Sequence, residues 1–164
     1  MPVRILYFLL LCASSALSAQ PANWREDTQN IENTVATLMQ LISIDKGDTV
    51  DWPRFNNLFL PKARFNYFTF NKSGELVFVN HSLAEFKQNA AYGKVKFKEV
   101  ELFKRINQFG KVAQVFQGYR FTVNDGELVR AGVNNIQLIN HENRWWIAHI
   151  SWQPETASDQ VPDK

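Results

Sequence analysis

The chain has 164 residues, which is enough for one domain after a leader has been removed. Eighteen basic and 16 acidic residues give a formal net charge of +2, and so weak a field gives no reason to expect nucleic acid or an anionic membrane as a partner. The single cysteine, Cys12, falls in the predicted leader, so the sequence predicts a mature domain without disulfides, thiolate metal ligands or a cysteine nucleophile.

Residues 1–19 predict a secretory signal peptide. Arg4 supplies a positive start, the short apolar run ILYFLLLCA follows, and SSALSA offers small residues for cleavage. The apolar run is too short for a transmembrane span. We expect cleavage after Ala19, with Ser18 as the alternative, and therefore a secreted or periplasmic protein with no membrane contact once the leader is gone. Residues 20–27 then form a lead-in to the domain.

Three helices are predicted in the N-terminal half of the domain. Apolar residues recur at helical spacing over residues 31–42, with Asp or Thr of EDT as the cap and DKGD as the end. Asp51 caps a short second helix that has Pro53 in its first turn. Ser82 and Glu85 have the spacing of a capping box, which predicts a third helix.

Six strands are predicted around and after the third helix. The segments ARFNYFTF and ELVFVN flank the turn NKSG and predict a hairpin. From Lys94 onward, alternation predicts four long antiparallel strands joined by the turns QFGK, NDG and NHEN. The apolar residues stand at odd positions up to Phe97 and at even positions from Val100. This shift predicts a β-bulge and a bend in the strand. Residues 154–164 are polar and predict a disordered tail.

This element order predicts an α+β fold that forms a single domain over residues 28–153. Helices near the start and long bent strands at the end favour a cone-shaped, curved antiparallel sheet wrapped over the three helices. A cone of this kind has an open mouth, and small-molecule sites form in such concavities.

The chain resembles the nuclear transport factor 2-like superfamily, which includes the SnoaL-like polyketide cyclases, scytalone dehydratase and ketosteroid isomerase. GKVAQVFQGYRF as a central strand and GVNNIQLINHENRWWIAHISW as the closing hairpin carry the resemblance, which covers roughly residues 28–153. It is greatest with small exported members, many of which have no assigned activity. The resemblance implies a cone-shaped α+β fold with a pocket, and often a homodimer joined through the outer face of the sheet, but no particular reaction.

The closing strand is apolar on both faces. The resemblance implies that Trp145 points inward, and alternation then places Ile147, His149 and Ser151 on the same side. Three large side chains face outward by the same rule and predict a dimer interface, because aromatic residues anchor interfaces. These interface residues are Trp146, Ile150 and Trp152. The alternative is that the C-terminal tail or the lead-in covers this outer patch.

The predicted pocket is an aromatic concavity dotted with polar groups. The predicted ligand-binding residues are Tyr67, Gln117, Tyr119, Asn135, Gln137, Trp145 and His149. This set depends on uninterrupted alternation, since one bulge reverses every later side chain of a strand. Such a pocket suits a small, flat, partly apolar molecule.

His149 and Tyr119 are the candidate catalytic residues. Histidine is a natural general base near neutral pH, and tyrosine can act as an acid or donate to a developing oxyanion. The alternatives for His149 are a hydrogen-bonded structural histidine and a ligand contact. Ketosteroid isomerase-like members use a buried aspartate, whereas no aspartate falls on the predicted inner faces of the four late strands, and Glu99 and Glu101 flank the predicted bulge. The three histidines lack the spacing of metal ligands, so the sequence predicts no metal and no cofactor.

Three functions therefore remain open. The leading hypothesis is an exported, homodimeric module that binds a small, partly apolar molecule and has no assigned reaction. The second is a cofactor-free isomerase, lyase or cyclase of the SnoaL-like or scytalone dehydratase-like type. The third is an interaction domain whose cone is filled by its own side chains. The size of the cavity separates the third function from the other two.

Overall fold

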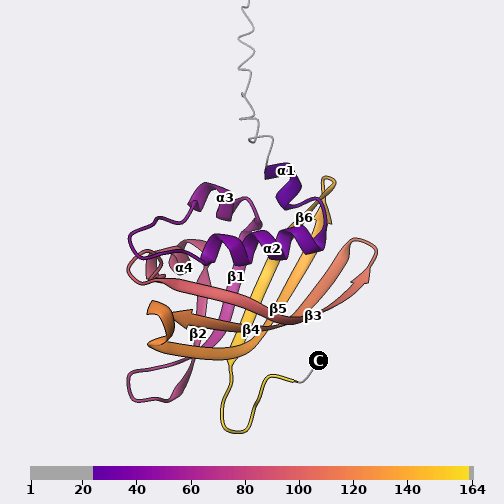
Figure 1. Cartoon of the computed structure of the whole chain (residues 1–164). Coiled ribbons are helices and arrows are strands. Elements are labelled where there is room, and N and C mark those ends of the chain that lie inside the picture. Colours follow the sequence, from indigo (N-terminus) through magenta and orange to yellow (C-terminus); the bar gives the residue numbers. More distant parts are fainter. Residues whose placement is uncertain (1–23, 163–164) are drawn as a thin grey trace, which may run out of the picture.

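The structure, a computed structural model, describes residues 24–162, so the predicted signal peptide lies outside the described residues. The three predicted helices correspond to α2, α3 and α4, and a short helix, α1, is added within the lead-in (Figure 1). None of the helices in the described residues is long and apolar enough to cross a membrane. The elements in chain order are α1 (Trp24–Asp27), α2 (Ile31–Ile42), α3 (Trp52–Asn56), β1 (Phe59–Phe70), β2 (Leu76–Ser82), α4 (Leu83–Asn89), β3 (Phe97–Phe109), β4 (Val112–Val123), a 3₁₀ turn (Asn124–Gly126), β5 (Leu128–His141) and β6 (Arg144–Pro154).

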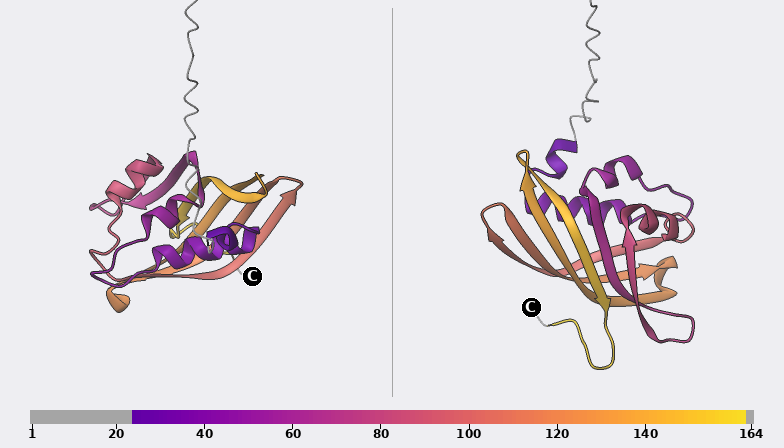
Figure 2. Two further views of the ribbon diagram at one scale, coloured as in Figure 1. Left: turned by 90° about the horizontal axis from the view of Figure 1, so that it is seen from above. Right: turned by 180° about the vertical axis from the view of Figure 1, so that it is seen from behind.

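All six strands form one curved sheet with the order β2-β1-β6-β5-β4-β3. Neighbouring strands are antiparallel except for β1 and β6, which are parallel. The helices lie on the concave side of the sheet, and Figure 2 shows the long strands curving around α2. The predicted α+β cone is confirmed, with one parallel pair in a sheet that the sequence predicted to be antiparallel throughout.

The caps of the helices follow from short polar side chains. The caps predicted for α3 and α4 are present. The cap of α2, however, is Asn30 rather than Asp27 or Thr28. Asp27 is engaged elsewhere, because its buried carboxylate forms an ion pair with the Arg54 guanidinium of α3 at 2.7 Å. This pair joins α1 to α3 at one end of the cone.

The bend of β3 is present, but its bulge lies further along the strand than predicted. The pairing of β3 with β4 shifts at Leu102, whereas the sequence pattern placed the change between Phe97 and Val100. Phe97 and Glu99 therefore stay on the same face of the strand, and this is the inner face. The apolar side chain that prompted the prediction, Val100, is exposed on the outside.

A second bulge, in β6, did not show in the sequence pattern. Ile147 and His149 pair with consecutive residues of β5, so Ala148 is the extra residue. Before the bulge the orientation is as predicted, and Trp145 and Ile147 are buried. After the bulge it is reversed: Ile150 is buried on the inner side, and His149 turns to the outer face. One inserted residue thus explains why the strand is apolar on both faces.

One end of the cone, here called the closed half, is packed solid with side chains. Its members come from α2, the α3–β1 segment, β4, β5 and β6, and all are buried. The backbone N–H of Ile147 also donates to the carbonyl of Leu58, which ties β6 to the end of α3. The principal residues of the closed half are Val35, Leu58, Phe59, Val115, Ile136, Leu138, Trp145 and Ile147.

The C-terminal tail returns along the outer face of the sheet, which differs from the disordered tail predicted for residues 154–164. The backbone N–H of Glu155 donates to the carbonyl of Ala131, and that of Val161 donates to the Glu155 carboxylate at 2.8 Å. A groove of about 410 Å³ lies between the tail and the sheet. Its apolar lining includes Phe68, Phe78, Phe116 and Val161. The tail therefore lies over part of the outer face.

Candidate functional site

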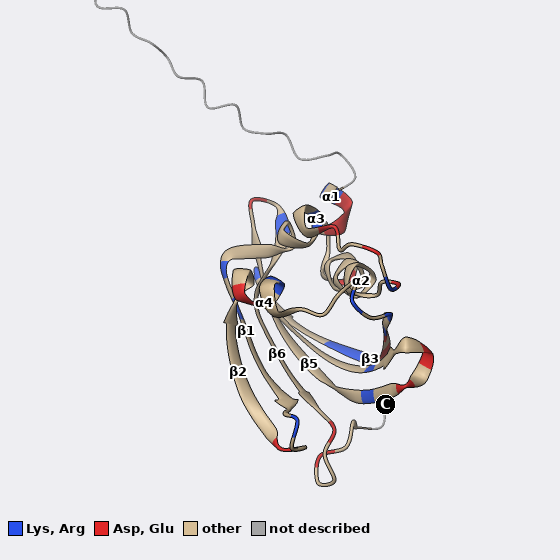
Figure 3. Ribbon diagram, turned by 90° about the vertical axis from the view of Figure 1, so that its left-hand side faces the viewer, with Lys and Arg blue, Asp and Glu red and all other residues tan. Residues whose placement is uncertain are grey.

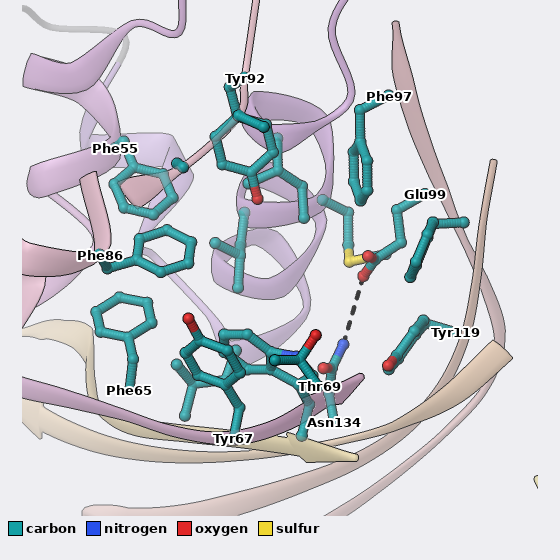
Figure 4. A pocket seen from close by; sticks show the side chains of 18 of the residues that line it. Phe55, Phe65, Tyr67, Thr69, Phe86, Tyr92, Phe97, Glu99, Tyr119 and Asn134 are labelled. Carbon is teal, nitrogen blue, oxygen red and sulfur yellow. Dashed lines mark hydrogen bonds between the residues drawn. The ribbon is translucent and has the colours of Figure 1, made fainter. Parts of the chain in front are cut away.

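A cavity of about 340 Å³ occupies the other end of the cone, here called the open half, between the helices and the inner face of the sheet (Figure 4). Its wall is mainly aromatic and is completed by aliphatic side chains of α2, β6 and the segment before β3. This volume is evidence against a cone filled by its own side chains. The aromatic members are Phe55, Phe65, Tyr67, Phe86, Tyr92, Phe97, Tyr119, Phe121 and Trp152.

Two pairs of parallel rings hold one side of this wall. The rings of Tyr67 and Trp152, from the parallel strands β1 and β6, stack with centroids 4.0 Å apart and planes 7° apart. Phe65 of β1 and Phe86 of α4 stack with centroids 4.4 Å apart. Aromatic side chains have few rotatable bonds, so stacked pairs form flat and rigid surfaces. One side of the open half is thus a flat, rigid aromatic surface.

Glu99 is the one ionisable side chain of the Asp, Glu, Lys, Arg or His type among the described residues that line the cavity. Its carboxylate accepts a hydrogen bond from the Asn134 amide nitrogen at 3.5 Å. Burial among apolar side chains raises the pKa of Glu99 to about 7, and the Asn134 hydrogen bond opposes this rise only in part. In Figure 3 the middle strands β5 and β6 are largely free of charged residues. The other residues that line the cavity with Glu99 are mainly apolar.

A chain of amides fixes the orientation of Asn134. Gln117 donates from its amide nitrogen to the Glu101 carboxylate at 2.6 Å, and its amide oxygen accepts from Asn134 at 3.1 Å. A carboxylate accepts hydrogen bonds but donates none, so Gln117 must turn its nitrogen toward Glu101 and its oxygen toward Asn134. Asn134 consequently presents its own nitrogen to Glu99. Gln117 and Asn134 are both buried, which makes this arrangement costly to reverse.

Three tyrosines add hydroxyl groups to the cavity. Burial raises the pKa of Tyr92 and of Tyr119, and the negative charge of Glu99 raises both further. Burial also raises the pKa of Tyr67, whose hydroxyl lies 3.3 Å from Nδ1 of His81. All three hydroxyls therefore stay protonated at neutral pH and can act as hydrogen-bond donors.

The predicted ligand-binding residues fall into two groups, and the first lies on the inner face. Tyr67 and Tyr119 line the cavity, as predicted. Gln117 also faces inward, but it lies behind Asn134 rather than on the cavity wall. Trp145 faces inward as well, yet it packs into the closed half, away from the cavity.

The second group, Asn135, Gln137 and His149, lies on the outer face, so their prediction as cavity residues was wrong. Asn134 lies on the inner face of β5. Because side chains alternate along a strand, its neighbour Asn135 and the exposed Gln137 face outward. His149 pairs with Gln137 after the β6 bulge and follows it outward. Partial burial lowers the pKa of His149. This histidine cannot reach a molecule in the cavity as the proposed base.

The same bulge in β6 makes the predicted dimer interface wrong for two of its three residues. Ile150 and Trp152 line the cavity instead of facing outward. Trp146, which precedes the bulge, does lie on the outer face, where the Arg144 guanidinium covers its ring 3.8 Å from the centroid. Its indole nitrogen donates to the carbonyl of His141 at 3.2 Å.

Glu99 and Asn134 are the site residues that sequence reasoning missed. A signal for Glu99 was present, because unbroken alternation from Val95 through Phe97 places it on the inner face. No comparable signal marks Asn134, since it adjoins a second asparagine, and only the register of β5 distinguishes the two. Within residues 24–162, no three His, Cys, Asp or Glu side chains gather in a way that could hold a metal ion.

The chain has the nuclear transport factor 2-like fold that its resemblance implied. No family model matches the chain, and no curated protein matches its sequence. Solved structures do match, with low sequence identity, and these likenesses establish the fold alone.

Three of these structures illustrate the likeness. A nuclear transport factor 2-like superfamily protein from Salmonella enterica serovar Typhimurium is 19% identical, with 81% of this chain and 94% of that chain covered and a TM-score of 0.57. A nuclear transport factor 2-like protein from Cytophaga hutchinsonii is 14% identical, with 77% and 99% covered and a TM-score of 0.54. The association domain of CaMKII from C. elegans is 17% identical, with 76% and 92% covered and a TM-score of 0.52.

Proposed function

We propose that the protein is a module that binds a small, partly apolar molecule in the open half of the cone. The observation that carries this proposal is the cavity of about 340 Å³, in which rigid aromatic walls surround one carboxyl group and one amide. Ligand sites are concave and mostly apolar, with a few polar groups that fix orientation, and this cavity has that composition. The predicted signal peptide supports a secreted or periplasmic location for the module.

A fluorescent probe tests whether the cavity accepts a ligand. N-phenyl-1-naphthylamine is neutral at pH 7, apolar and flat, and its emission rises when it leaves water. We expect the mature protein to enhance this emission in a saturable way. Ala90→Trp should abolish the enhancement, because Ala90 lines the cavity and a larger side chain there fills it.

Ala84→Trp is the matched control, since Ala84 lies on α4, the helix that Ala90 caps, but is exposed and does not line the cavity. It should bind the probe as the unmodified protein does. Equal loss of binding in both variants, or no saturable binding by the unmodified protein, would contradict the proposal.

The second candidate function is a cofactor-free isomerase or lyase, with Glu99 in the role that the sequence gave to His149. A carboxyl group with a pKa of about 7 in an apolar cavity is suited to move a proton at neutral pH, and a protonated Tyr119 can stabilise a developing oxyanion. Hydrogen–deuterium exchange at the α-carbon of 2-tetralone, followed by NMR, tests this chemistry. Glu99→Gln should abolish the enhancement of exchange, whereas Glu32→Gln, on the exposed side of α2, should retain it.

The protein is also proposed to form a homodimer through its outer face. Four apolar side chains from four neighbouring strands stand in one cross-strand row: Phe109, Val112, Ile139 and Trp146. Phe109 is 87% exposed, and Val112 and Ile139 are exposed as well, which is unusual for a face that meets only water. Similar solved structures include an association domain, which is consistent with a homo-oligomer.

Sedimentation velocity tests the dimer. Val112→Asp should convert it to a monomer, because the charge would be buried without a partner at the centre of the row. Val129→Asp places the same charge on another exposed strand position and should leave the dimer intact. A monomeric unmodified protein would contradict this part of the proposal.

A further inference from the structure

The cavity carries a negative charge and holds no positive one. Glu99 is the one acidic residue in its wall, and no lysine, arginine or histidine of the described residues lines it. An anionic ligand would therefore meet repulsion and find no cation to pair with. The ligand must be neutral or positively charged, and the surroundings of Glu99 favour the second.

The Glu99 carboxylate is poorly supplied with hydrogen-bond donors. Within residues 24–162, the one hydrogen bond that its side-chain oxygens accept comes from Asn134 and is long, at 3.5 Å. Two carboxylate oxygens together offer about four acceptor positions. A ligand that brings several donors would complete this set, and a primary ammonium group brings three.

Aromatic rings adjoin the carboxylate in an unbroken series, three of whose members are labelled around it in Figure 4. Tyr92 meets Phe97 edge to face at a centroid distance of 5.6 Å, and Phe97 stacks on Phe121 at 5.2 Å. Tyr119 continues the series, parallel to Phe121 at 6.2 Å. The faces of aromatic rings attract cations, and the attraction grows where water is excluded.

None of the elements packed around Glu99 supplies a compensating cation. The segment before β3 contributes Tyr92, β4 contributes Tyr119, and β5 contributes the Asn134 amide. Ser43 follows the end of α2. Its hydroxyl accepts a hydrogen bond from the backbone N–H of Glu99 at 3.0 Å.

The nearest lysines in the chain are neutralised elsewhere. Lys96 forms an ion pair with Asp125 at 2.6 Å, and Lys98 forms one with Asp45 at 3.6 Å. Both lie outside the cavity wall. The charge of Glu99 is thus left for a ligand to balance.

Resting on the proposed binding function, we propose that the ligand is a small organic cation, a primary amine on a flat apolar skeleton, with its ammonium group at Glu99 and its skeleton between the aromatic walls. Three features support this assignment: an acidic group without a cation, an unfilled set of acceptors, and a surround of aromatic faces. The ammonium would donate to the carboxylate, and the Tyr67–Trp152 pair would hold the skeleton.

This binding mode has a defined proton linkage. Burial holds the pKa of Glu99 at about 7, so near that pH part of the population carries a proton on it. A bound ammonium favours the carboxylate and lowers that pKa, so amine binding at pH 7 releases protons. A neutral ligand that accepts a hydrogen bond from the protonated acid would instead take protons up. The direction of proton transfer therefore distinguishes the two binding modes.

Displacement of N-phenyl-1-naphthylamine by three probes of similar shape tests the inference. Phenethylamine carries an ammonium group, 2-phenylethanol a hydroxyl and 3-phenylpropanoate a carboxylate. We expect phenethylamine to displace the fluorophore at a concentration at least about tenfold lower than 2-phenylethanol, and 3-phenylpropanoate to be the weakest. Calorimetric titration of phenethylamine in two buffers of different ionisation enthalpy should show proton release at pH 7.

Glu99→Gln should remove the preference for the amine over the alcohol, and Glu32→Gln should preserve the preference. Equal displacement by amine and alcohol, or proton uptake on amine binding, would overturn the inference and leave the binding function standing. Failure of all three probes to displace a bound fluorophore would also overturn it. Absence of fluorophore binding would refute the proposed function itself, and the inference with it.

Discussion

The closed and open halves of the cone are built from the same strands but with different kinds of side chain. In the closed half, β4, β5 and β6 present branched aliphatic residues such as Val115, Ile136 and Ile147, and all three are 0% exposed. In the open half, the same strands present Tyr119, Asn134 and Trp152 to a cavity. Branched aliphatic side chains interdigitate and fill the closed half, whereas the rings of the open half line a space that they do not fill. The change in residue type along each strand thus separates a packed core from a cavity.

The largest expected effect comes from one matched pair of substitutions in β6. Ile147 is fully buried in the closed half, whereas Ile150 borders the cavity. Ile147→Ala should lower the free energy of unfolding by about 2–5 kcal/mol, because the surrounding core can collapse only in part. Ile150→Ala should cost less, since its side chain already borders a space that no side chain fills. Urea unfolding of both variants measures the difference, and equal costs would contradict the division into halves.

Glu99→Gln should have the next largest effect, visible in the pH dependence of stability. The ordinary glutamate pKa is 4.5, and burial raises that of Glu99 to about 7, so the folded state binds the extra proton between these values. Stability of the unmodified protein should therefore fall as pH rises from 4.5 to 7 and stay level above that window. The full difference is about 3 kcal/mol.

The Glu99→Gln variant should match the unmodified protein near pH 4 and exceed its stability at pH 8. Unfolding by urea at a series of pH values measures this, with Glu32→Gln as the control that keeps the original pH dependence. A parallel pH dependence in Glu99→Gln and the unmodified protein would show that Glu99 is not held in an apolar setting.

A smaller effect is expected where β5 passes beneath Tyr119. A Cβ atom at Gly132 would collide with the backbone carbonyl of Gln153 and with the Tyr119 hydroxyl, so Gly132→Ala should destabilise by about 1–3 kcal/mol. At Gly118 the collision is with the partly exposed ring of Phe103, which can turn aside. Gly118→Ala should therefore cost less, and thermal unfolding of both variants gives the comparison. The reverse order would contradict the tight packing assigned to Tyr119.

The smallest effect expected is the coupling between the stacked rings of Tyr67 and Trp152. A double-mutant cycle with Tyr67→Leu and Trp152→Leu should give a coupling energy of about 0.5–1.5 kcal/mol, because the rings are parallel and 4.0 Å apart. Urea unfolding supplies the four free energies. Additive effects would show that the two rings do not form a common wall.

The fold could be read from the sequence because its signals are local. The apolar spacing of α2, the capping box at Ser82 and the hairpin turns each depend on a few neighbouring residues, and each gave the right element. In the closed half, Trp145 and Ile147 keep the inward orientation that the family resemblance and strand alternation implied. Local patterns settle which elements form and where most of the core lies.

The residues that line the open half could not be predicted from local patterns, because β-bulges determine which side chains face the cavity. The β6 bulge at Ala148 arises from pairing with β5 and has no sequence mark of its own, yet it exchanges His149 for Ile150 on the inner face. In β3, a bulge at Leu102 rather than before Val100 brings Glu99 into the cavity. Each error followed from a shift of one or a few residues in a long-range pairing.

The central claim is that the open half is a ligand cavity organised around Glu99. The most direct test is a pH titration of the side-chain carboxyl carbons by NMR in protein labelled with ¹³C-glutamate, with Glu99→Gln to assign the signal. The account predicts a Glu99 resonance that titrates near pH 7 and a rise in its pKa when N-phenyl-1-naphthylamine displaces water from the cavity. A resonance that titrates near the ordinary glutamate value and does not respond to the probe would contradict it.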